Sequence, residues 1–506
     1  MQPTHGYRAD LPTTLLSVAQ VRQHERDAIA QLGDDFVLMR RAAKAAWDTV
    51  CDYWPKPGCM AVMLGAGNNA GDGLLLAILA QQGGWQVVCY DVLTSTQSPA
   101  CYQRARQEAM AAGVVIEPWE GRLVGDVDLL VDGLLGIGLD RELSPSLVAA
   151  IDTMNAHAVP VLALDIATGL CADRGIVLGA SVQATVTVTF LALKRGLFTA
   201  EGPDVSGHIH CAPLTCAQWL PTATIADDVC QRISANLHHR PAEVLPKRRG
   251  NGHKGMYGHA LVVGGDHGMG GAVLLAAEAC ARSGAGRTRC ATRAAHVAPL
   301  LQRCPEVMVH EVVSGLALQA LLPSVTAIAC GPGLGLGSWS ELLLQIALQT
   351  DLPLVLDADA LTMLSSPSWQ QTFVQREVIL TPHPGEAARL LGVSTHDIQQ
   401  DRFAAASALS QRYQAVVVLK GQGTLIASPE GRLALCSDGN AGMSSAGMGD
   451  VLTGVIVAAL AQGLDAWRAA CVGVCAHSHA ADVAAQQGMR GMLASDVVGQ
   501  LRGVIN

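Results

Sequence analysis

Short apolar runs recur along residues 1–210 and are separated by amphipathic segments of helical length. Runs rich in aliphatic and β-branched residues are typical of strands that are buried on both faces, as in a parallel sheet. The amphipathic segments between them predict helices that cover both faces of this sheet. The strands are expected at Met60–Leu64, Trp85–Asp91, Val127–Asp132, Val161–Asp165 and Val182–Leu193. The first part of the chain is therefore predicted to be a doubly wound α/β domain.

A second series of apolar runs follows Asn251, at His259–Val263, Val325–Cys330, Leu354–Asp357, Glu377–Leu380 and Ala415–Leu419. It predicts a second α/β domain with a mostly parallel central sheet. The intervening segment, Thr215–Arg249, contains prolines and a short basic cluster and is interpreted as a connector with one helix inside it. We place the boundary near Thr222, which gives domains 1–221 and 222–506. Short-period repeats and low-complexity tracts are absent from the sequence, which excludes solenoid folds.

Composition narrows the function to chemistry on small ligands. The 506 residues carry 34 Lys and Arg against 43 Asp and Glu, a net charge of −9, with no long basic run. We therefore expect no nucleic-acid partner and no binding to an anionic membrane surface. The 53 glycines and an aromatic content of only 4% suit an enzyme whose backbone approaches its ligands at strand-to-helix turns.

Other sequence features bear on location and redox state. The N-terminus has no apolar segment of signal-peptide length, so the chain is expected to be cytoplasmic. The longest charge-free stretch, Val312–Ser340, is interrupted by prolines and glycines and is not expected to span a membrane. The shorter run Val451–Leu460 is interpreted as a core helix. The 15 cysteines include no Cys-x-x-Cys pair and are expected to be reduced thiols that pack in the core.

The first strand end carries a glycine-rich loop, Gly65–Gly73, which leads into a helix rich in Leu and Ala. Up to Ala70 the loop satisfies G-x-G-x-x-G/A, the fingerprint of a Rossmann-like dinucleotide site, and Asp91 ends the next strand where a ribose-binding acid would stand. A dehydrogenase is therefore one interpretation, and a plain glycine-rich turn is another. Neither interpretation requires the polar insert Asn68-Asn69 or the acid Asp72, so these residues are the informative part of the loop.

Two further strands end in an acid that is followed by glycine. Asp132 precedes Gly-Leu-Leu-Gly-Ile-Gly, and Asp165 precedes Ile-Ala-Thr-Gly, which contains Thr168. In a doubly wound sheet these strand ends open onto one crevice, where Asn69 would join them. Carboxylate, amide and hydroxyl oxygens together suit a hard cation. Each acid alone is equally well explained as a helix cap, but three such loops in one domain favour a ligand site.

At these residues the chain resembles the N-terminal epimerase domain of the bifunctional NAD(P)H-hydrate repair enzymes. The likeness covers about residues 17–215 and rests on Leu38–Ala43, the Asn-Asn loop, the two acidic loops, and Phe190–Leu197 around Lys194. The resemblance implies that Asp165 binds substrate as the acid/base. It implies potassium ligands at Asn69, Asp132 and Thr168. It implies substrate contacts at Asn68, Asn69, Ala70, Gly71, Asp72, Gly136, Ile137, Gly138, Leu139, Asp140, Arg141, Glu142 and Asp165.

Two positions depart from the pattern that is usual in this family. Ala70 stands where the family usually has Gly, and Ala167-Thr168 stand where it usually has Pro-Ser. Thr168 keeps the hydroxyl that an ion would need, but its extra methyl group puts the geometry of the ion site in question.

The second half of the chain carries its candidate chemistry in loops that follow apolar runs. They are Gly264–Ala272, Gly331–Gly335, Asp357–Ala360, Thr381–Glu386, Lys420–Thr424 and Gly439–Asp450. The last loop opens a helix, where backbone amides could surround a phosphate and Asp450 could reach a substrate hydroxyl as a general base. Taken singly, His383 is better explained as a structural residue than as a catalytic one, and Lys420 is equally well explained as a solvated charge at a strand end. No Gly-Lys-Ser/Thr occurs at Walker spacing, which excludes a P-loop.

The order of these loops resembles the ribokinase-like superfamily, with Gly-Met-Gly-Asp in place of the commoner Gly-Ala-Gly-Asp. Over about residues 245–500 the closer likeness is to the NAD(P)H-hydrate dehydratase domain. It is carried by His253–Gly255, Arg282–Gly286, Pro305–Met308, Thr381–Glu386 and the final glycine-rich loop. This resemblance implies hydrate contacts at Ala272, Gly333, His383 and the catalytic Asp450. It implies that adenine nucleotide is held by Lys420, Gly421, Gln422, Gly423, Thr424 and Gly449.

The two resemblances, in this order, imply repair of hydrated NADH and NADPH (NADHX and NADPHX). The first domain would epimerise the R and S hydrates at C6 with potassium in its site. The second would dehydrate the S hydrate with magnesium while ADP becomes AMP and phosphate, the choice of ADP over ATP resting on likeness to bacterial members. A homo-oligomer is expected. Three alternatives stay open: a ribokinase-like small-molecule kinase fused to a Rossmann-like binding domain, a dehydrogenase, and a nucleotide sensor without turnover.

Overall fold

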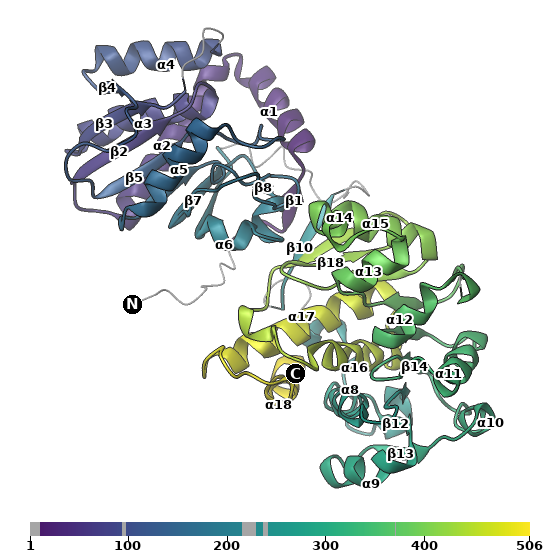
Figure 1. The fold of residues 1–506 in the computed structure, drawn as a ribbon. Helices are drawn as coiled ribbons and strands as arrows, with labels where there is room; N and C mark the ends of the chain where they lie inside the picture. Colours follow the sequence, from purple (N-terminus) through teal and green to yellow (C-terminus); the bar gives the residue numbers. More distant parts are fainter. Residues whose placement is uncertain (1–10, 94–97, 215–228, 236–240, 370) are drawn as a thin grey trace. The chain divides into compact units, whose positions relative to one another are not determined.

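The chain divides into two compact units, Met1–Cys230 and Gln231–Asn506 (Figure 1). The structure is a computed structural model that describes residues 11–93, 98–214, 229–235, 241–369 and 371–506. The domain boundary predicted near Thr222 lies outside the described residues. Both units are α/β, as the sequence predicts.

Unit 1, in its described part, is built on a seven-stranded sheet in the order β4-β3-β2-β5-β6-β7-β9. Every neighbouring pair of strands is parallel. The order reverses between β2 and β5, so the sheet is doubly wound and its ligand crevice is expected beside these two strands. The strands are β2 (Cys59–Leu64), β3 (Gln86–Asp91), β4 (Val115–Pro118), β5 (Leu129–Gly133), β6 (Val161–Leu164), β7 (Val186–Phe190) and β9 (His208–Ala212).

Helices cover both faces of the unit 1 sheet (Figure 1). They are α1 (Val18–Leu32), α2 (Asp35–Tyr53), α3 (Asn68–Gln82), α4 (Ala100–Ala111), α5 (Pro145–Ala156) and the short α6 (Gly202–Ser206). α2 and α3 pack against alternate strand side chains, such as Val62 and Leu64 of β2. The intervening side chain Met63 is also buried. Burial on both faces explains why these strands are continuous apolar runs in the sequence.

A small strand pair joins the start of the chain to a segment near the end of unit 1. β1 (Thr14–Leu16) runs parallel to β8 (Leu193–Lys194), with Leu16 in register with Lys194. α1 begins immediately afterwards, where Ser17 and Gln20 form a capping box. This pairing fixes the start of α1 beside the Lys194 segment.

Unit 2 contains a second, mostly parallel sheet with strands in the order β13-β12-β11-β14-β15-β16-β17-β18-β19-β10. The pairs from β13 to β17 are parallel, and the hairpin strands β18 and β19 add antiparallel pairs. The order reverses between β11 and β14, which marks a second expected crevice. The strands are β10 (Cys230–Ile233), β11 (His259–Val263), β12 (Arg287–Thr292), β13 (Met308–Glu311), β14 (Ala327–Cys330), β15 (Leu354–Leu356), β16 (Val378–Leu380), β17 (Val416–Leu419), β18 (Thr424–Ala427) and β19 (Leu433–Cys436).

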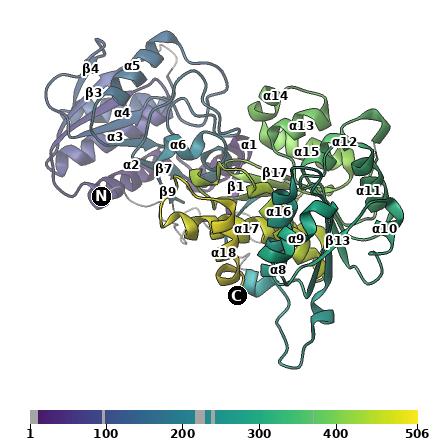
Figure 2. The same cartoon turned by 60° about the horizontal axis from the view of Figure 1, so that its bottom comes forward.

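Helices also cover both faces of the unit 2 sheet. α8, α16 and α17 pack together over one core, while α12, α13, α14 and α15 form a group that stays together in both views (Figures 1 and 2). α16 is almost wholly buried, which confirms the prediction that Val451–Leu460 is a core helix. The helices are α7 (Pro241–Val244), α8 (Gly270–Arg282), α9 (Ala294–Arg303), α10 (Gly315–Gln319), α11 (Ser338–Gln349), α12 (Ala358–Leu364), α13 (Pro384–Leu391), α14 (Thr395–Gln400), α15 (Arg402–Tyr413), α16 (Met448–Ala461), α17 (Ala466–Ala485) and α18 (Ala494–Ile505).

Some strand limits differ from the predictions. The run Val182–Leu193 forms a strand only over Val186–Phe190, because Leu191 has a left-handed backbone (φ 65°) that turns the chain toward β8. Asp165 lies just after its strand and is also left-handed (φ 65°). These turns place polar groups at the strand end instead of within the sheet.

Two absences concern the described residues alone. None of the helices in the described ranges is long and apolar enough to cross a membrane. The described cysteines are free thiols, most of them buried, as expected for packing residues.

Candidate active sites

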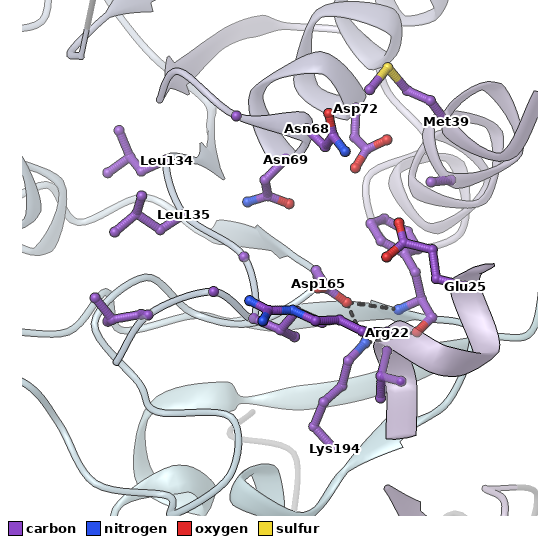
Figure 3. A pocket seen from close by; sticks show the side chains of 18 of the residues that line it. Arg22, Glu25, Met39, Asn68, Asn69, Asp72, Leu134, Leu135, Asp165 and Lys194 are labelled. Carbon is purple, nitrogen blue, oxygen red and sulfur yellow. Dashed lines mark hydrogen bonds and ion pairs between the residues drawn. The ribbon is translucent and has the colours of Figure 1, made fainter. Parts of the chain in front are cut away.

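A cavity of about 790 Å³ opens at the carboxyl ends of the parallel strands in unit 1. Its walls include the loops after β2, β5 and β6, together with side chains of α1 and α2 (Figure 3). The loops after β2 and β5 touch, because a Cβ atom on Gly65 would stand 1.9 Å from the carbonyl oxygen of Leu134. Only glycine fits this close approach of the two backbones. The cavity lies beside β2 and β5, where the strand order reverses, as expected for a doubly wound sheet.

Most of the predicted substrate contacts of unit 1 line this cavity. They are Asn68, Asn69, Asp72, Gly136, Ile137, Gly138, Leu139, Asp140, Arg141, Glu142 and Asp165. Ala70 and Gly71 do not belong to the described lining. Ala70 is fully buried, and a Cβ atom on Gly71 would stand 2.6 Å from the Met39 side chain. These two residues, in the first turn of α3, are therefore packed in the interior of the unit and do not face the cavity.

Asp165 is held at the cavity by a buried network (Figure 3). Its carboxylate forms an ion pair with Lys194 and accepts a hydrogen bond from the Phe190 N–H at 3.2 Å. Lys194 also donates to the Thr189 hydroxyl and to the Phe190 carbonyl oxygen, each at 2.8 Å. The Lys194 side chain is 1% exposed and that of Asp165 is 14% exposed. These contacts stabilise the ionised carboxylate, which can accept a proton from a ligand in the cavity.

The predicted potassium ligands meet beside the cavity. Thr168 donates its N–H to Asp132 Oδ2 and its hydroxyl to Asp132 Oδ1, both at 2.7 Å. The N–H groups of the lining residues Leu134 and Leu135 donate to Asp132 and Thr168, at 3.2 and 3.0 Å. Asn69 lies close by, since a Cβ atom on Gly133 would stand 3.5 Å from its carbonyl oxygen. The loops after β2, β5 and β6 thus bring the three predicted ligands into one region.

The donor set of this region suits a hard cation. The Asn69 side chain is buried, and neither its Nδ2 nor its Oδ1 atom has a hydrogen-bond partner among the described residues. A buried amide without partners is costly, which makes an additional ligand at Asn69 favourable. Burial raises the pKa of Asp132 to about 6, while the hydrogen bonds from Thr168 oppose that rise. An amide, a hydroxyl and a carboxylate oxygen fit potassium chemistry.

Two further carboxyl groups, Glu25 of α1 and Asp72 of α3, line the same cavity (Figure 3). Burial raises the pKa of Asp72 well above its usual range, and the charges of Asp165 and Glu25 raise it further. Burial also raises the pKa of Glu25, with Asp165 acting in the same direction and Lys194 opposing it. One buried lysine cannot neutralise three carboxylates, so burial and the neighbouring negative charge shift Glu25 and Asp72 toward their protonated forms.

Four charged lining residues, Arg22, Glu25, Asp35 and Lys194, are absent from the residues predicted for the site. Lys194 stands in the Phe190–Leu197 segment, so a sequence signal for it existed. Arg22 and Glu25 lie on a helix that has no catalytic motif. The pairing of β1 with β8, the hydrogen bond from the Val18 N–H to Asp173 and packing on α2 bring that helix to the cavity.

The dehydrogenase alternative required Asp91 as a ribose-binding acid. Its two carboxylate oxygens are instead held by Arg106 of α4, at 2.8 and 2.6 Å. The Arg106 pKa is raised by this paired geometry. Asp91 does not belong to the described lining of the cavity, so the structure disfavours a dehydrogenase.

The predicted loops of unit 2 also gather at the carboxyl ends of parallel strands, with Asp357 at their centre. Asp357 follows β15, is 1% exposed, and accepts hydrogen bonds from three directions. Lys420 Nζ and the Thr381 hydroxyl donate to Oδ1, both at 2.8 Å, and the Thr453 hydroxyl donates to Oδ2 at 2.9 Å. This buried carboxylate therefore ties together the ends of β15, β16 and β17 and the helix α16.

Lys420 is the cation of this network. Besides Asp357, its Nζ atom approaches Glu386 Oε2 at 3.8 Å. Burial alone would lower the Lys420 pKa, but Asp357 and Glu386 raise it above its usual value. Lys420 therefore stays charged, and a Cβ atom on Gly449 would stand 3.2 Å from Nζ. The predicted nucleotide residues Lys420 and Gly449 thus lie together.

Asp450 occupies the first turn of α16, two residues after Met448 at the helix start. Burial raises its pKa to about 7, and the negative charge of Asp357 acts in the same direction while Lys420 opposes it. A carboxyl group that titrates near neutrality can serve as a general base at physiological pH. The exposed N–H groups of the same helix start can bind an anion.

The remaining predicted residues of the unit 2 site divide into two groups. Ala272 and Gly333 are neighbours, since a Cβ atom on Gly333 (φ 54°) would stand 3.1 Å from that of Ala272. His383 caps α13: its Nδ1 accepts from the N–H of Gly385 at 3.0 Å. Burial lowers the His383 pKa, and Lys420 adds to that effect. His383 is therefore a neutral capping residue at the edge of the network, and a structural role accounts for its contacts.

The predicted nucleotide loop, Lys420–Thr424, is the turn between β17 and β18. The buried guanidinium of Arg402, at the start of α15, donates to the carbonyl oxygens of Leu419, Lys420 and Gly423, each at 3.4 Å. A Cβ atom on Gly421 (φ 137°) would stand 2.7 Å from Arg402 Nη1, so glycine is required there. Sequence analysis did not identify Arg402, because it lies in an ordinary helix. It supports the backbone of the loop.

Two parallel sheets with carboxyl groups at their strand ends, one beside a cavity and one at a glycine-rich helix start, define this chain as a two-domain α/β enzyme. A family model described as YjeF-related protein N-terminus matches residues 35–196. A second, described as NAD(P)H-hydrate dehydratase, matches residues 260–502. The chain belongs to the family of bifunctional NAD(P)H-hydrate repair enzymes, which confirms the resemblance seen in the motifs.

The family assignment rests on relatives that match almost the full length of the chain. The bifunctional NAD(P)H-hydrate repair enzyme Nnr of Coxiella burnetii is 42% identical over 98% of this chain and 100% of that protein. Its counterpart in Escherichia coli is 41% identical over 98% of this chain and 95% of that protein. The solved ADP/ATP-dependent NAD(P)H-hydrate dehydratase of Bacillus subtilis is 34% identical, covers 52% of this chain and 94% of its own, and has a TM-score of 0.48.

Proposed function

We propose that this chain repairs hydrated NADH and NADPH, with unit 1 exchanging the R and S hydrates at C6 and unit 2 dehydrating the S hydrate. The observation that carries the proposal is the full-length likeness to bifunctional repair enzymes. The two sites support it, because each places a carboxyl group where the corresponding reaction needs proton transfer. A stereospecific dehydratase repairs only one epimer, so joining it to an epimerase makes the repair complete.

Epimerisation in unit 1 proceeds without oxidation or reduction. The hydrate carries a hydroxyl group at C6, beside the ring nitrogen, whose lone pair can expel that hydroxyl as water once it is protonated. The planar iminium that remains can be attacked by water from either face. Asp165 is the proposed acid/base, since its carboxylate reaches the cavity and is stabilised by Lys194 and the Phe190 N–H. Asn68, Asp72 and the Gly136–Glu142 loop are proposed to contact the substrate.

Potassium is proposed to be held by Asn69, Asp132 and Thr168, on the strength of their buried oxygen donors. When bound, the ion would supply positive charge that orders the three loops. Ala70 and Gly71 shape the first turn of α3 and keep Asn69 at the cavity.

Dehydration in unit 2 is proposed to start with deprotonation of the 6-hydroxyl by Asp450. The hydroxyl oxygen then attacks the terminal phosphorus of ADP, and the bond between the two phosphates of ADP breaks, which releases AMP. The phosphorylated oxygen leaves C6 as phosphate, C5 loses a proton to water, and the ring regains its conjugated dihydropyridine form. Ala272, Gly333 and His383 are proposed to face the hydrate. The nucleotide would be held by Lys420, Gly421, Gln422, Gly423, Thr424 and Gly449.

Magnesium is proposed to enter with the nucleotide. The described residues contain no group of three His, Cys, Asp or Glu side chains arranged to hold a metal ion. Nucleotide phosphates can supply the missing ligands, as in other phosphoryl-transfer sites. ADP as the co-substrate, a cytoplasmic location, a homo-oligomeric state and the absence of nucleic-acid and membrane partners complete the proposal.

An absorbance assay tests the whole proposal. A mixture of R and S hydrates of NADH is incubated with potassium, magnesium and ADP or ATP, and the return of reduced nicotinamide is followed in the near ultraviolet. Rapid, complete recovery is expected. Recovery that stops at the S fraction and then follows spontaneous epimerisation would contradict the role of unit 1.

Matched variants separate the two activities. D165N is expected to abolish R to S exchange while dehydration of pure S hydrate continues, and D450A is expected to show the reverse. D450A should keep its affinity for ADP, because Asp450 acts on the hydrate. No recovery with either nucleotide, together with accumulation of a phosphorylated product, would favour the kinase alternative.

A further inference from the structure

Glu25 projects from α1 into the cavity of unit 1 and has no role in the mechanism above (Figure 3). α1 ends before residue 35, where the family-model match begins. The groups that act electrostatically on Glu25 come from its own helix and from the ends of β6 and β8: Arg22, Arg26, Asp165 and Lys194. Glu25 in turn acts on Asp72, which faces it from α3. Glu25 therefore belongs to the same charge cluster as Asp165.

The proposed epimerisation requires two proton transfers on different faces of the ring. On one face the departing hydroxyl must receive a proton, so that it leaves as water. On the other face the attacking water must lose a proton, so that a neutral hydroxyl remains on C6. A single carboxylate on one side of a bound ring cannot reach both oxygens. The reaction therefore calls for a second acid/base across the cavity from Asp165.

Glu25 and Asp165 differ in the way this scheme requires. Asp165 is ion-paired with the buried Lys194 and accepts the Phe190 N–H, which stabilises its ionised form. The Glu25 carboxyl group accepts no hydrogen bond among the described residues, and burial raises its pKa. Asp165 is thus suited to accept a proton, and Glu25 is suited to donate one.

Glu25 suits proton exchange with solvent better than its neighbour Asp72. Asp72 is only 8% exposed, and burial raises its pKa well above its usual range, which favours its protonated form. Glu25 is partly exposed on a surface helix. After each turnover its protonation state must be reset by water, which a partly exposed carboxyl group allows.

We propose that Glu25 is the second catalytic acid/base of unit 1 and exchanges a proton with the substrate oxygen on the ring face opposite Asp165. This inference rests on the proposed epimerase function. In one direction protonated Glu25 donates its proton to the departing hydroxyl, the C6–O bond breaks and water leaves. A second water forms a C–O bond on the other face and gives its proton to Asp165. In the reverse direction Asp165 donates and Glu25 accepts, so atoms and charges balance.

Substitution of Glu25 in the full-length protein tests the proposal. E25Q is expected to lower kcat for R to S exchange by about 10²-fold to 10⁴-fold while KM changes little. E25D, which keeps a carboxyl group, should recover part of the rate. D27N removes a carboxylate from the same helix at an exposed position outside the described cavity lining and should behave as wild type. Dehydration of pure S hydrate by unit 2 serves as the internal control for folding.

The pH profile gives a second readout that a structural role would not move. Exchange by the wild-type protein should decline on the alkaline side as Glu25 loses its proton, and this decline should be absent from the residual activity of E25Q. Exchange by E25Q at the wild-type rate would overturn the assignment. A raised KM with unchanged kcat would indicate a binding role instead and would also overturn it. If the wild-type protein itself fails to exchange the epimers, the proposed function is wrong, and that outcome is distinct from failure of Glu25 alone.

Discussion

Thr168 donates two hydrogen bonds of 2.7 Å to the carboxylate of Asp132, one from its backbone N–H and one from its hydroxyl. The first bond holds the loop after β6 against the end of β5 whatever the side chain at position 168. The second depends on the hydroxyl, which also accepts the Leu135 N–H at 3.0 Å. The same oxygen therefore supports the cavity wall and the proposed ion site, and the threonine fits there in place of the serine usual in the family.

Replacing Thr168 by valine removes the hydroxyl and keeps the shape of the side chain, so it tests the role of the hydroxyl alone. T168V leaves one oxygen of a buried carboxylate without its donor and should destabilise unit 1 by about 1.5–3 kcal/mol. T168S keeps the hydroxyl and should cost about 1 kcal/mol for the lost methyl group. Urea unfolding measures both effects. The potassium concentration for half-maximal epimerisation should rise in T168V and stay near wild type in T168S.

Thr187 provides a matched control for this comparison. Its hydroxyl is also buried and donates to the Ser206 carbonyl oxygen at 2.7 Å, away from the proposed ion site. T187V should lose stability without changing the potassium dependence. An unchanged potassium dependence in T168V would contradict the assignment of Thr168 as an ion ligand.

Replacing Lys194 by methionine should damage both stability and epimerisation. The change leaves Asp165 without its buried cation and should cost about 3–5 kcal/mol in the free energy of unfolding. R to S exchange should fall with it, because the carboxylate is no longer stabilised, while unit 2 should dehydrate pure S hydrate normally. K44M removes an exposed lysine that pairs with Asp48, and should cost no more than about 1 kcal/mol. Equal effects of the two substitutions would contradict the buried role of Lys194.

The dehydratase reaction should depend on the ionisation of Asp450. Its pKa is raised to about 7, so the basic form is lost as the pH falls below neutrality. We expect kcat/KM for S hydrate to rise with pH through about 7 and then level off. D450N should lower the rate by about 10²-fold to 10⁴-fold above pH 7, and by less at acidic pH, where Asp450 of the wild-type protein is already protonated. A wild-type profile that is flat from pH 5 to 8 would contradict the role of Asp450 as the base.

The raised pKa of Asp450 also predicts that the free energy of unfolding depends on pH. Because the folded-state pKa of Asp450 lies above the 3.8 of a free aspartate side chain, its contribution to stability is fully present below pH 3.8 and is lost as the pH rises through about 7. D450N removes this loss, so the variant should be more stable than wild type at pH 8, with a smaller difference at pH 5. Thermal unfolding at the two pH values measures it. A variant less stable than wild type at pH 8 would show that the carboxylate is stabilised by contacts in the folded protein.

Arg402 should control nucleotide binding through the backbone of the Lys420–Thr424 loop. R402M removes the donor to three carbonyl oxygens and should raise KM for ADP by about tenfold, with a smaller change in kcat. R412M removes an exposed arginine of the same helix that donates to the Leu391 carbonyl oxygen, and should leave KM near wild type. Titration of ADP at saturating S hydrate measures both. A loss of kcat at unchanged KM in R402M would contradict a role in the nucleotide loop.

Much of the fold and of both sites follows from the sequence for physical reasons that act locally. Strands buried on two faces must be apolar throughout, so β2, β5, β11 and β17 stand out as runs. Loops at the carboxyl ends of such strands meet in space, so Asp132, Asp165 and Asp450 could be recognised before their surroundings were known. Strands such as β4 and β13 escape prediction because they lie at sheet edges and are only partly buried.

The tertiary structure alone decided which side chains complete the sites. Nothing in the amphipathic pattern of α1 marks Glu25 as a cavity residue, because the helix reaches the cavity through the pairing of β1 with β8, far apart in the sequence. Arg402 likewise contacts the nucleotide loop only because α15 packs beside β17. The sequence by itself determined the two domain types, the family and the strand-end acids, since these depend on local periodicity and motif spacing. The partners of those acids, and the raised pKa of Glu25, Asp72 and Asp450, depend on burial and on charges brought together by folding, which local periodicity does not record.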